Sequence, residues 1–184
     1  FAGDIGPGNC LIDEWIRKNS KKKFDKWGLI ARSWKKNRLI LNQALDNFQF
    51  YDKSSLDIKN FDISFAKGLS TEDGASTLTE FTAELIHEGL NNLLNKNKQD
   101  SQIPKNIIVC GGGRKNKYLM ELLNQKLLCK NFSTIDEYNI DGDFIESQAF
   151  AFLAIRSILN LPISFPETTG CKRECTGGEI IKNY

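Results

Sequence analysis

The sequence contains a single histidine, His87, and no apolar run long enough to cross a bilayer, which requires about 20 residues. His87 follows Ile86 in an amphipathic segment, so we expect a core or boundary residue of a helix. This single histidine has no plausible partner in the sequence, so a Ser-His-Asp arrangement is not indicated. The formal net charge is only +2, and the lysine clusters at 21–23 and 35–36 are short. These clusters are typical of a solvated helical face, so we expect neither a nucleic-acid nor a membrane partner.

Cysteine is scarce and odd in number, at five residues. Together with the lack of a signal peptide, this favours reduced thiols and a cytoplasmic location. Cys171 and Cys175 lie close enough to share a metal ion, but a zinc site needs four ligands. The other cysteines lie in or beside apolar segments, so we interpret all five as free thiols and predict no resident metal site.

The remaining composition is that of a globular protein. The chain has 184 residues, of which 40% are apolar and 26% charged, enough for one large domain or two small ones. No initiator methionine is present, and Phe1-Ala2 runs directly into a glycine turn of the kind that follows a strand. We therefore expect the chain to be cut from a longer protein at its N-terminus.

The most informative segment is a glycine-rich turn, Cys110-Gly111-Gly112-Gly113-Arg114-Lys115-Asn116. It follows the apolar run 107–109, which predicts a strand at 106–110, and it precedes a periodic segment that predicts a helix at about 116–128. Glycines let backbone N–H groups approach an anion at a helix N-terminus. The turn matches neither the dinucleotide fingerprint nor the P-loop. A nucleotide or phosphate site and a merely tight turn both remain open.

A second glycine-rich turn, Asp4-Ile5-Gly6-Pro7-Gly8-Asn9, lies near the start of the chain. Asp4 has the chemistry either of a general base or of a water-mediated Mg²⁺ ligand. The alternative is an ordinary turn in which the aspartate caps the following helix.

Helical periodicity and short apolar runs alternate along the chain, which predicts the α/β class. Helices are expected at about 8–19, once or twice within 20–50, and from a capping box at Ser70 and Asp73 to about Leu94. Short strands are expected near 132–140, followed by a last helix at 144–159 and a loop-like tail. The last helix is apolar on nearly two faces, so we expect it to be buried. Glu146 near its start is either a charge favoured by the helix dipole or a ligand contact.

In this order, these motifs resemble the C-terminal half of the 1,6-anhydro-N-acetylmuramic acid kinase family, within the actin, hexokinase and Hsp70 superfamily. The resemblance spans essentially the whole chain and is carried by residues 3–15, 72–83, 109–120, 146–154 and 161–170.

The resemblance implies a ribonuclease-H-like domain over residues 1–184, a mixed sheet flanked by helices, that binds ATP and Mg²⁺ on one side of a cleft. The family opens the anhydro ring of its amino-sugar substrate with water and phosphorylates O6, in peptidoglycan recycling. By resemblance, Asp4 activates the water and Glu146 contacts the sugar. The implied nucleotide-binding residues are Gly6, Gly8, Asn9, Gly111, Gly112, Gly113 and Asn116.

The sequence departs from the family pattern at Gly3, where phenylalanine is usual, and at Arg114, where a small residue is usual. Arg114 adds a cation that either touches a phosphate or faces solvent. The family's first phosphate loop has no counterpart here. We therefore expect a fragment that is inactive without its N-terminal domain, and a homodimer at full length. The alternatives are a sugar- or nucleotide-binding module that has lost catalysis, and a structural or chaperone-type member of the superfamily.

Overall fold

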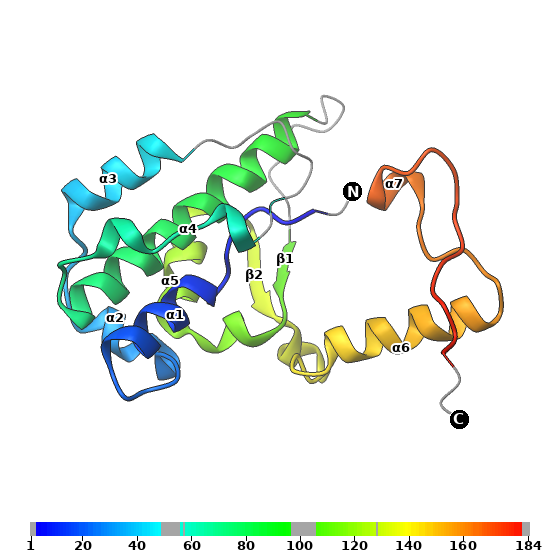
Figure 1. Cartoon of the computed structure of the whole chain (residues 1–184), viewed down its shortest axis with the longest axis horizontal. Helices are drawn as coiled ribbons and strands as arrows, with labels where there is room; N and C mark the ends of the chain where they lie inside the picture. Colours follow the sequence, from blue (N-terminus) through cyan, green and yellow to red (C-terminus); the bar gives the residue numbers. More distant parts are fainter. Residues whose placement is uncertain (1–2, 49–55, 57, 97–105, 128, 182–184) are drawn as a thin grey trace.

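The computed structural model describes residues 3–48, 56, 58–96, 106–127 and 129–181. Helices dominate it, and its described strands, β1 (Asn106–Val109) and β2 (Asn131–Thr134), form a two-stranded parallel sheet (Figure 1). The register pairs Asn106 with Asn131 and Val109 with Thr134. The predicted α/β class is confirmed.

The helix α4 (Thr71–Lys96) forms the centre of the molecule (Figure 1). It begins where the capping box predicted, because the Ser70 hydroxyl accepts a hydrogen bond from the Asp73 N–H at 3.0 Å. That hydroxyl also donates to the Asp73 carboxylate at 2.8 Å, so Asp73 reaches the Ser70 side chain. A capped first turn fixes the start of a helix that its neighbours then bury.

Shorter helices pack around α4: α1 (Cys10–Asn19), α2 (Leu29–Arg32), α3 (Arg38–Asn47) and α5 (Lys117–Lys126). Trp15 of α1 packs against Gly74, where an added Cβ would meet the indole at 2.2 Å. Its Nε1 donates to the Thr71 carbonyl at 2.9 Å. Glycine at 74 therefore allows the close packing of α1 on α4.

The connection between the two strands is α5, which places its apolar side between the sheet and α4. Leu119, Leu122 and Leu123 are buried there beside Ala83. Parallel strands require such a crossover, so β1, α5 and β2 form one βαβ unit. The sequence predicted the strand and the helix of this unit within two residues of their observed ends.

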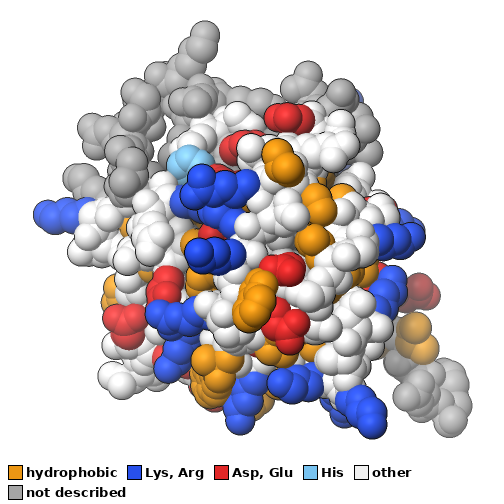
Figure 2. All heavy atoms as spheres, turned by 90° about the vertical axis from the view of Figure 1, so that its left-hand side faces the viewer, with side chains coloured by type: hydrophobic (Ala, Val, Ile, Leu, Met, Phe, Trp, Pro, Cys, Tyr) orange, Lys and Arg blue, Asp and Glu red, His pale blue; other side chains and the backbone are white. Residues whose placement is uncertain are grey.

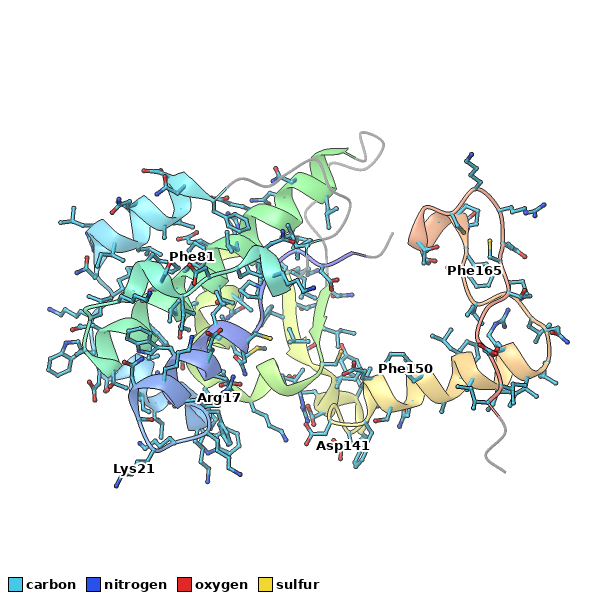
Figure 3. All side chains as sticks on the ribbon, viewed as in Figure 1. Arg17, Lys21, Phe81, Asp141, Phe150 and Phe165 are labelled. Carbon is cyan, nitrogen blue, oxygen red and sulfur yellow. The ribbon has the colours of Figure 1, made fainter. Side chains whose placement is uncertain are left out.

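The last long helix, α6 (Ile145–Ile158), is exposed, so its predicted burial is wrong. It extends away from α1–α5, with the short helix α7 (Pro166–Thr169) and the return segment beyond it (Figure 1). Large side chains on it face solvent, including Phe150 at 65% and Ile158 at 61% exposed. In Figure 3, Phe150 lies far from Phe81 of the α4 core. An apolar helix is buried only where another surface meets it, and no other described helix or strand packs along this one.

The tail, which we predicted to be a loop, contains the short helix α7 and several backbone contacts. Ser164 and Cys175 form an isolated antiparallel bridge. The Ser157 hydroxyl of α6 donates to the Gly177 carbonyl at 2.5 Å, and Arg156 Nε donates to the Pro162 carbonyl at 2.5 Å. Between α6 and this return segment lies a largely apolar cavity of about 370 Å³, lined by residues such as Phe150, Leu153 and Ile163.

Charges on the face at the left of Figure 1 are of both signs and interspersed (Figure 2). Lys21, Lys22 and Lys23 are exposed, as a solvated face requires. Lys36 has a different surrounding, because it pairs with the buried carboxylate of Glu80 at 2.9 Å.

Candidate active site between two glycine turns

The first glycine turn is pressed against α4. An added Cβ at Gly6 would lie 2.8 Å from Ile86, and one at Gly89 would lie 2.7 Å from Ile5. Close packing on α4 therefore requires glycine at position 6, a reason independent of any ligand. At Gly8, by contrast, an added Cβ would meet nothing within 4 Å, and the φ of +55° favours glycine.

Asp4 is exposed in the chain that leads to this turn, and its carbonyl accepts a hydrogen bond from the Leu56 N–H at 2.9 Å. Within the described residues, positions 3–9 form no strand, and the position of the strand expected before the turn lies outside the described residues. The N-cap of α1 is Asn9. Asp4 is therefore not the N-cap residue of that helix.

The second glycine turn leaves β1 through Gly111, whose φ is +75°, and continues as a 3-10 turn over Gly112–Lys115. An added Cβ at Gly111, Gly112 or Gly113 would meet nothing within 4 Å. These glycines therefore border open space, and a ligand could approach their backbone. The helix predicted at about 116–128 begins directly after the turn, with Asn116 as its N-cap residue.

Asn116 joins the two turns. Its Oδ1 accepts a hydrogen bond from the Leu119 N–H at 3.1 Å and caps α5. Its Nδ2 donates to Oδ1 of Asn9 at 3.4 Å. Asn116 is only 3% exposed and lies over Gly28, where a Cβ would come within 2.1 Å of its Oδ1. The structure thus brings together two turns that are about a hundred residues apart in sequence.

Sequence reasoning missed Gly28. Its φ of +70° and its close approach to Asn116 both require glycine. The neighbouring Trp27 has a φ of 62°, and the Lys117 ammonium lies 5.3 Å from the centre of its ring. The Trp-Gly pair was a possible turn signal, but nothing in the sequence linked it to Asn116.

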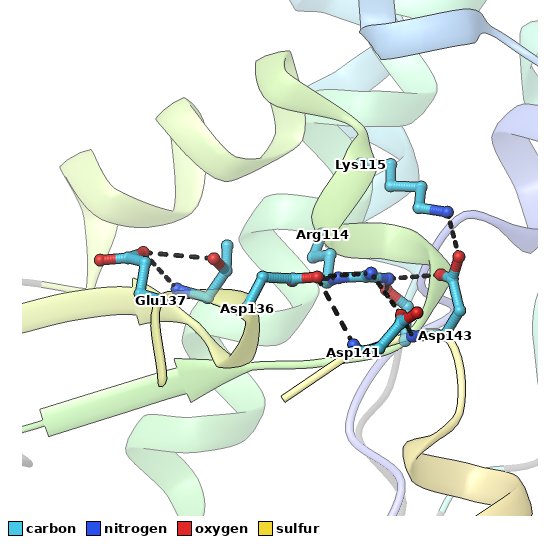
Figure 4. Close-up of polar contacts among 9 residues, drawn as sticks. Arg114, Lys115, Asp136, Glu137, Asp141 and Asp143 are labelled. Atoms are coloured by element: carbon cyan, nitrogen blue, oxygen red, sulfur yellow. Dashed lines mark hydrogen bonds and ion pairs between the residues drawn. The ribbon is translucent and has the colours of Figure 1, made fainter. Parts of the chain in front are cut away.

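Arg114 does not face solvent, which corrects one of the two readings of this residue. It is buried and forms a bidentate pair with Asp136, through Nε at 2.5 Å and Nη2 at 2.9 Å (Figure 4). Its Nη1 contacts Asp143 at 2.6 Å and the Gly111 carbonyl at 3.0 Å. Lys115 also pairs with Asp143.

These contacts shift the acidities of the groups in the cluster. Hydrogen bonding to Arg114 lowers the pKa of Asp136 to about 2. Hydrogen bonds from Lys115 and then Arg114 lower the pKa of Asp143. Hydrogen bonding to Asp136 and Asp143 raises the pKa of Arg114. Near neutral pH the cluster therefore contains ionised partners, and each such charge-assisted hydrogen bond is stronger than a neutral one.

Glu146 is exposed in the first turn of α6, three residues after Asp143. Among the described residues, no hydrogen bond joins Glu146 to either glycine turn. Among the described residues, it is linked to the second turn through the preceding loop, where Asp143 pairs with Arg114 and Lys115.

A second buried charge escaped the sequence analysis. Glu80 of α4 is 4% exposed, and its carboxylate approaches Lys36 at 2.9 Å, Lys126 at 4.0 Å and the Tyr118 hydroxyl at 3.3 Å. Burial, followed by the nearby charge of Glu80, raises the pKa of Tyr118. The amphipathic pattern of α4 gave no sign that this acid faces inward.

All five cysteines are free thiols. Within the described residues, no three His, Cys, Asp or Glu side chains are grouped so that they could hold a metal ion. The described helices are also too short or too polar to cross a membrane.

Comparison with known proteins identifies the family. The sequence profile described as anhydro-N-acetylmuramic acid kinase matches residues 1–183. The chain belongs to the anhydro-N-acetylmuramic acid kinase family. A protein of that name from Pelagibacter ubique is 51% identical over 98% of the chain and 48% of its own length.

Other members of the anhydro-N-acetylmuramic acid kinase family match over the same extent. The protein from Zymomonas mobilis is 37% identical over 98% of the chain and 48% of its own length. The protein from Rhodospirillum rubrum is 39% identical over 96% of the chain and 46% of its own length. The chain thus spans about half the length of these relatives and corresponds to their C-terminal half.

Proposed function

We propose that this chain forms the nucleotide-binding side of the active site of an ATP-dependent kinase that acts on 1,6-anhydro-N-acetylmuramic acid. The enzyme opens the anhydro ring with water and phosphorylates O6, which gives N-acetylmuramic acid 6-phosphate. The observation that carries the proposal is the hydrogen bond between Asn9 and Asn116. It sets the two glycine turns side by side at one edge of the α4–α5 core.

The residues of the second turn fit a nucleotide. Gly111, Gly112 and Gly113 border open space, and a side chain on any of them would project into it. Preorganised backbone N–H groups neutralise phosphoryl charge without a P-loop lysine. We assign Gly6, Gly8, Asn9 and Asn116 to the same site, with Asn9 and Asn116 fixing the spacing of the two turns.

The residues also fit Mg²⁺, which is held by one or two carboxylates together with phosphate oxygens and water rather than by a cage of protein ligands. Asp4 is an exposed carboxylate beside the first turn. When bound, ATP with Mg²⁺ supplies the phosphoryl group and offsets its negative charge. Asp4 accepts a proton from the attacking water, and Glu146 accepts a hydrogen bond from a sugar hydroxyl.

We further propose that the chain adopts the C-terminal domain of a ribonuclease-H-like pair. The β1–α5–β2 unit and the central α4 support this assignment. In the family enzyme the cleft closes between this domain and the N-terminal half. The chain alone therefore binds nucleotide but does not catalyse the reaction. We also propose that the full-length enzyme is a homodimer, which sedimentation analysis tests.

The exposed apolar side of α6 is the proposed docking surface for that N-terminal half. The relatives are about twice as long as this chain, so half of the family protein is available to cover the side of α6 along which no other described helix or strand packs. Contiguous exposed apolar residues usually mark such an interface. Glu146, at the base of α6, would then point into the cleft from the same helix.

The function is tested by substituting Asp4→Asn in the full-length enzyme. Loss of a general base typically costs 10²–10⁴-fold in rate, so kcat should fall by at least about 100-fold while ATP affinity changes less than about threefold. Isothermal titration and a coupled ADP-release assay measure the two quantities. The matched control is Asp62→Asn, an exposed carboxylate that accepts a hydrogen bond from Ser64, and it should leave both unchanged.

An unchanged kcat together with weakened ATP affinity would refute the role given to Asp4. Turnover by the isolated 184 residues at the rate of the full-length enzyme would refute the need for the N-terminal half. Nucleotide binding without any turnover in the full-length protein would favour a non-catalytic binding module.

A further inference from the structure

Arg114 is a buried cation that directly follows the three glycines of the second turn. It is 8% exposed and lies in the 3-10 turn that begins at Gly112. We propose that Arg114 is a positioning residue, which fixes the glycine turn of the nucleotide site to the loop from which α6 begins. This proposal rests on the proposed function for the role of the turn itself.

The contacts of the guanidinium show that it acts on the protein rather than on a ligand. A guanidinium carries five N–H donors. Two are used by Asp136, and Nη1 serves Asp143 and Gly111. A third carboxylate, that of Asp141, has one oxygen 3.7 Å from Nη2. Four of the five donors of Arg114 are therefore used within the protein, which holds the guanidinium against the loop (Figure 4).

Arg114 and the loop at 141–143 together hold both polar backbone atoms of Gly111. The Gly111 N–H donates to the Gly142 carbonyl at 3.1 Å, and its carbonyl accepts from Arg114 Nη1 at 3.0 Å. The φ of Gly111 is +75°, a backbone conformation that glycine adopts readily and other residues rarely adopt. The loop and Arg114 thus remove the conformational freedom that the glycine brings.

This arrangement also requires glycine at position 142. An added Cβ at this position would lie 2.4 Å from Arg114 Nε and 2.8 Å from Ile135 Cγ2. Its peptide N–H also approaches Asp136 at 3.5 Å. The guanidinium can pack this closely on the loop only because residue 142 has no side chain.

The same loop leads directly into α6. Asp143 lies two residues before the helix, and Glu146 is in its first turn. Since no other described helix or strand packs along α6, the Arg114 cluster is the main polar connection between its base and the glycine turn. A change in Arg114 should therefore alter the nucleotide turn and the start of α6 together.

The experiment measures amide hydrogen exchange and ADP·Mg²⁺ affinity for three variants of this chain. Arg114→Ala should speed exchange at least tenfold both in residues 110–116 and in residues 140–148, and weaken ADP at least tenfold. Arg114→Lys keeps the charge but loses the planar set of donors that binds a carboxylate in a bidentate manner. It should therefore show a smaller change in each quantity than Arg114→Ala. Arg32→Ala, which breaks an exposed pair with Glu121 at 2.9 Å, is the control and should change neither.

Gly142→Ala provides an independent variant, because it displaces the guanidinium while Arg114 remains. It should reproduce the paired increase in exchange. An increase in only one of the two segments, or in neither, would overturn the proposal, as would a uniform increase that includes α4. If the unmodified chain binds no ADP, the proposed nucleotide function fails, and the exchange measurement alone decides the role of Arg114.

Discussion

At the scale of single residues, the site depends on polar side chains that each hold two parts of the backbone. Asn116 caps α5 and contacts Asn9, while Arg114 holds Gly111 and the loop before α6. Both roles depend on nearby glycines, Gly28 and Gly142, whose missing side chains make the room. The glycines of this chain thus have two roles: some allow close packing of these polar side chains, and others leave space for a ligand.

The Arg114 cluster should make stability depend on pH in acid. The pKa of Asp136 is lowered to about 2 in the folded chain, against about 3.9 in an unfolded one. A lowered folded pKa means that the stabilisation is present above about pH 4 and is lost as the pH falls toward 2. Urea midpoints of the unmodified chain and of Asp136→Asn should therefore differ at pH 6 and converge near pH 2. An equal difference at both pH values would contradict this role of the ionised carboxylate.

At the scale of elements, local signals predicted what local interactions determine. The start of α4 was predicted from Ser70 and Asp73, whose hydrogen bonds lie within one turn. The positions of β1 and α5 followed from an apolar run and a helical period. Glu80 could not be predicted, because its burial depends on Lys36 and Lys126 from other parts of the chain.

The capping box gives a direct test at this scale. Ser70→Ala removes the acceptor for the Asp73 N–H and should destabilise the chain by about 1 kcal/mol. Chemical denaturation measures the change. The control is Ser33→Ala, which removes an exposed hydroxyl that donates to the Ile30 carbonyl at 2.8 Å and should cost less than about 0.5 kcal/mol. Equal losses in the two variants would argue against the cap as the reason that α4 begins at Thr71.

At the scale of the whole molecule, the sequence predicted the class and the pair of turns but not the placement of α6. Its apolar pattern predicted burial, since a helix apolar on most sides is normally enclosed. Burial needs a second surface, and periodicity cannot say whether that surface lies in the same 184 residues. The exposed side chains of α6 include Phe150, Phe152 and Ile155. They therefore indicate the surface on which the N-terminal half is proposed to dock.

The proposed docking surface predicts that α6 gains protection from the N-terminal half of a family kinase. In this chain alone, amides of α6 should exchange faster than those of α4, because few buried contacts oppose their opening. Adding the separately produced N-terminal half of the Pelagibacter ubique relative should slow exchange in α6 and leave α4 unchanged. Phe152→Asp, which places a charge on the exposed apolar surface, should abolish that protection. Lys18→Asp is a suitable control, since Lys18 is exposed on α1 and pairs only with Glu14 at 2.6 Å among the described residues. Protection of α1 or α3 in place of α6 would move the interface to another face of the molecule and refute the assignment.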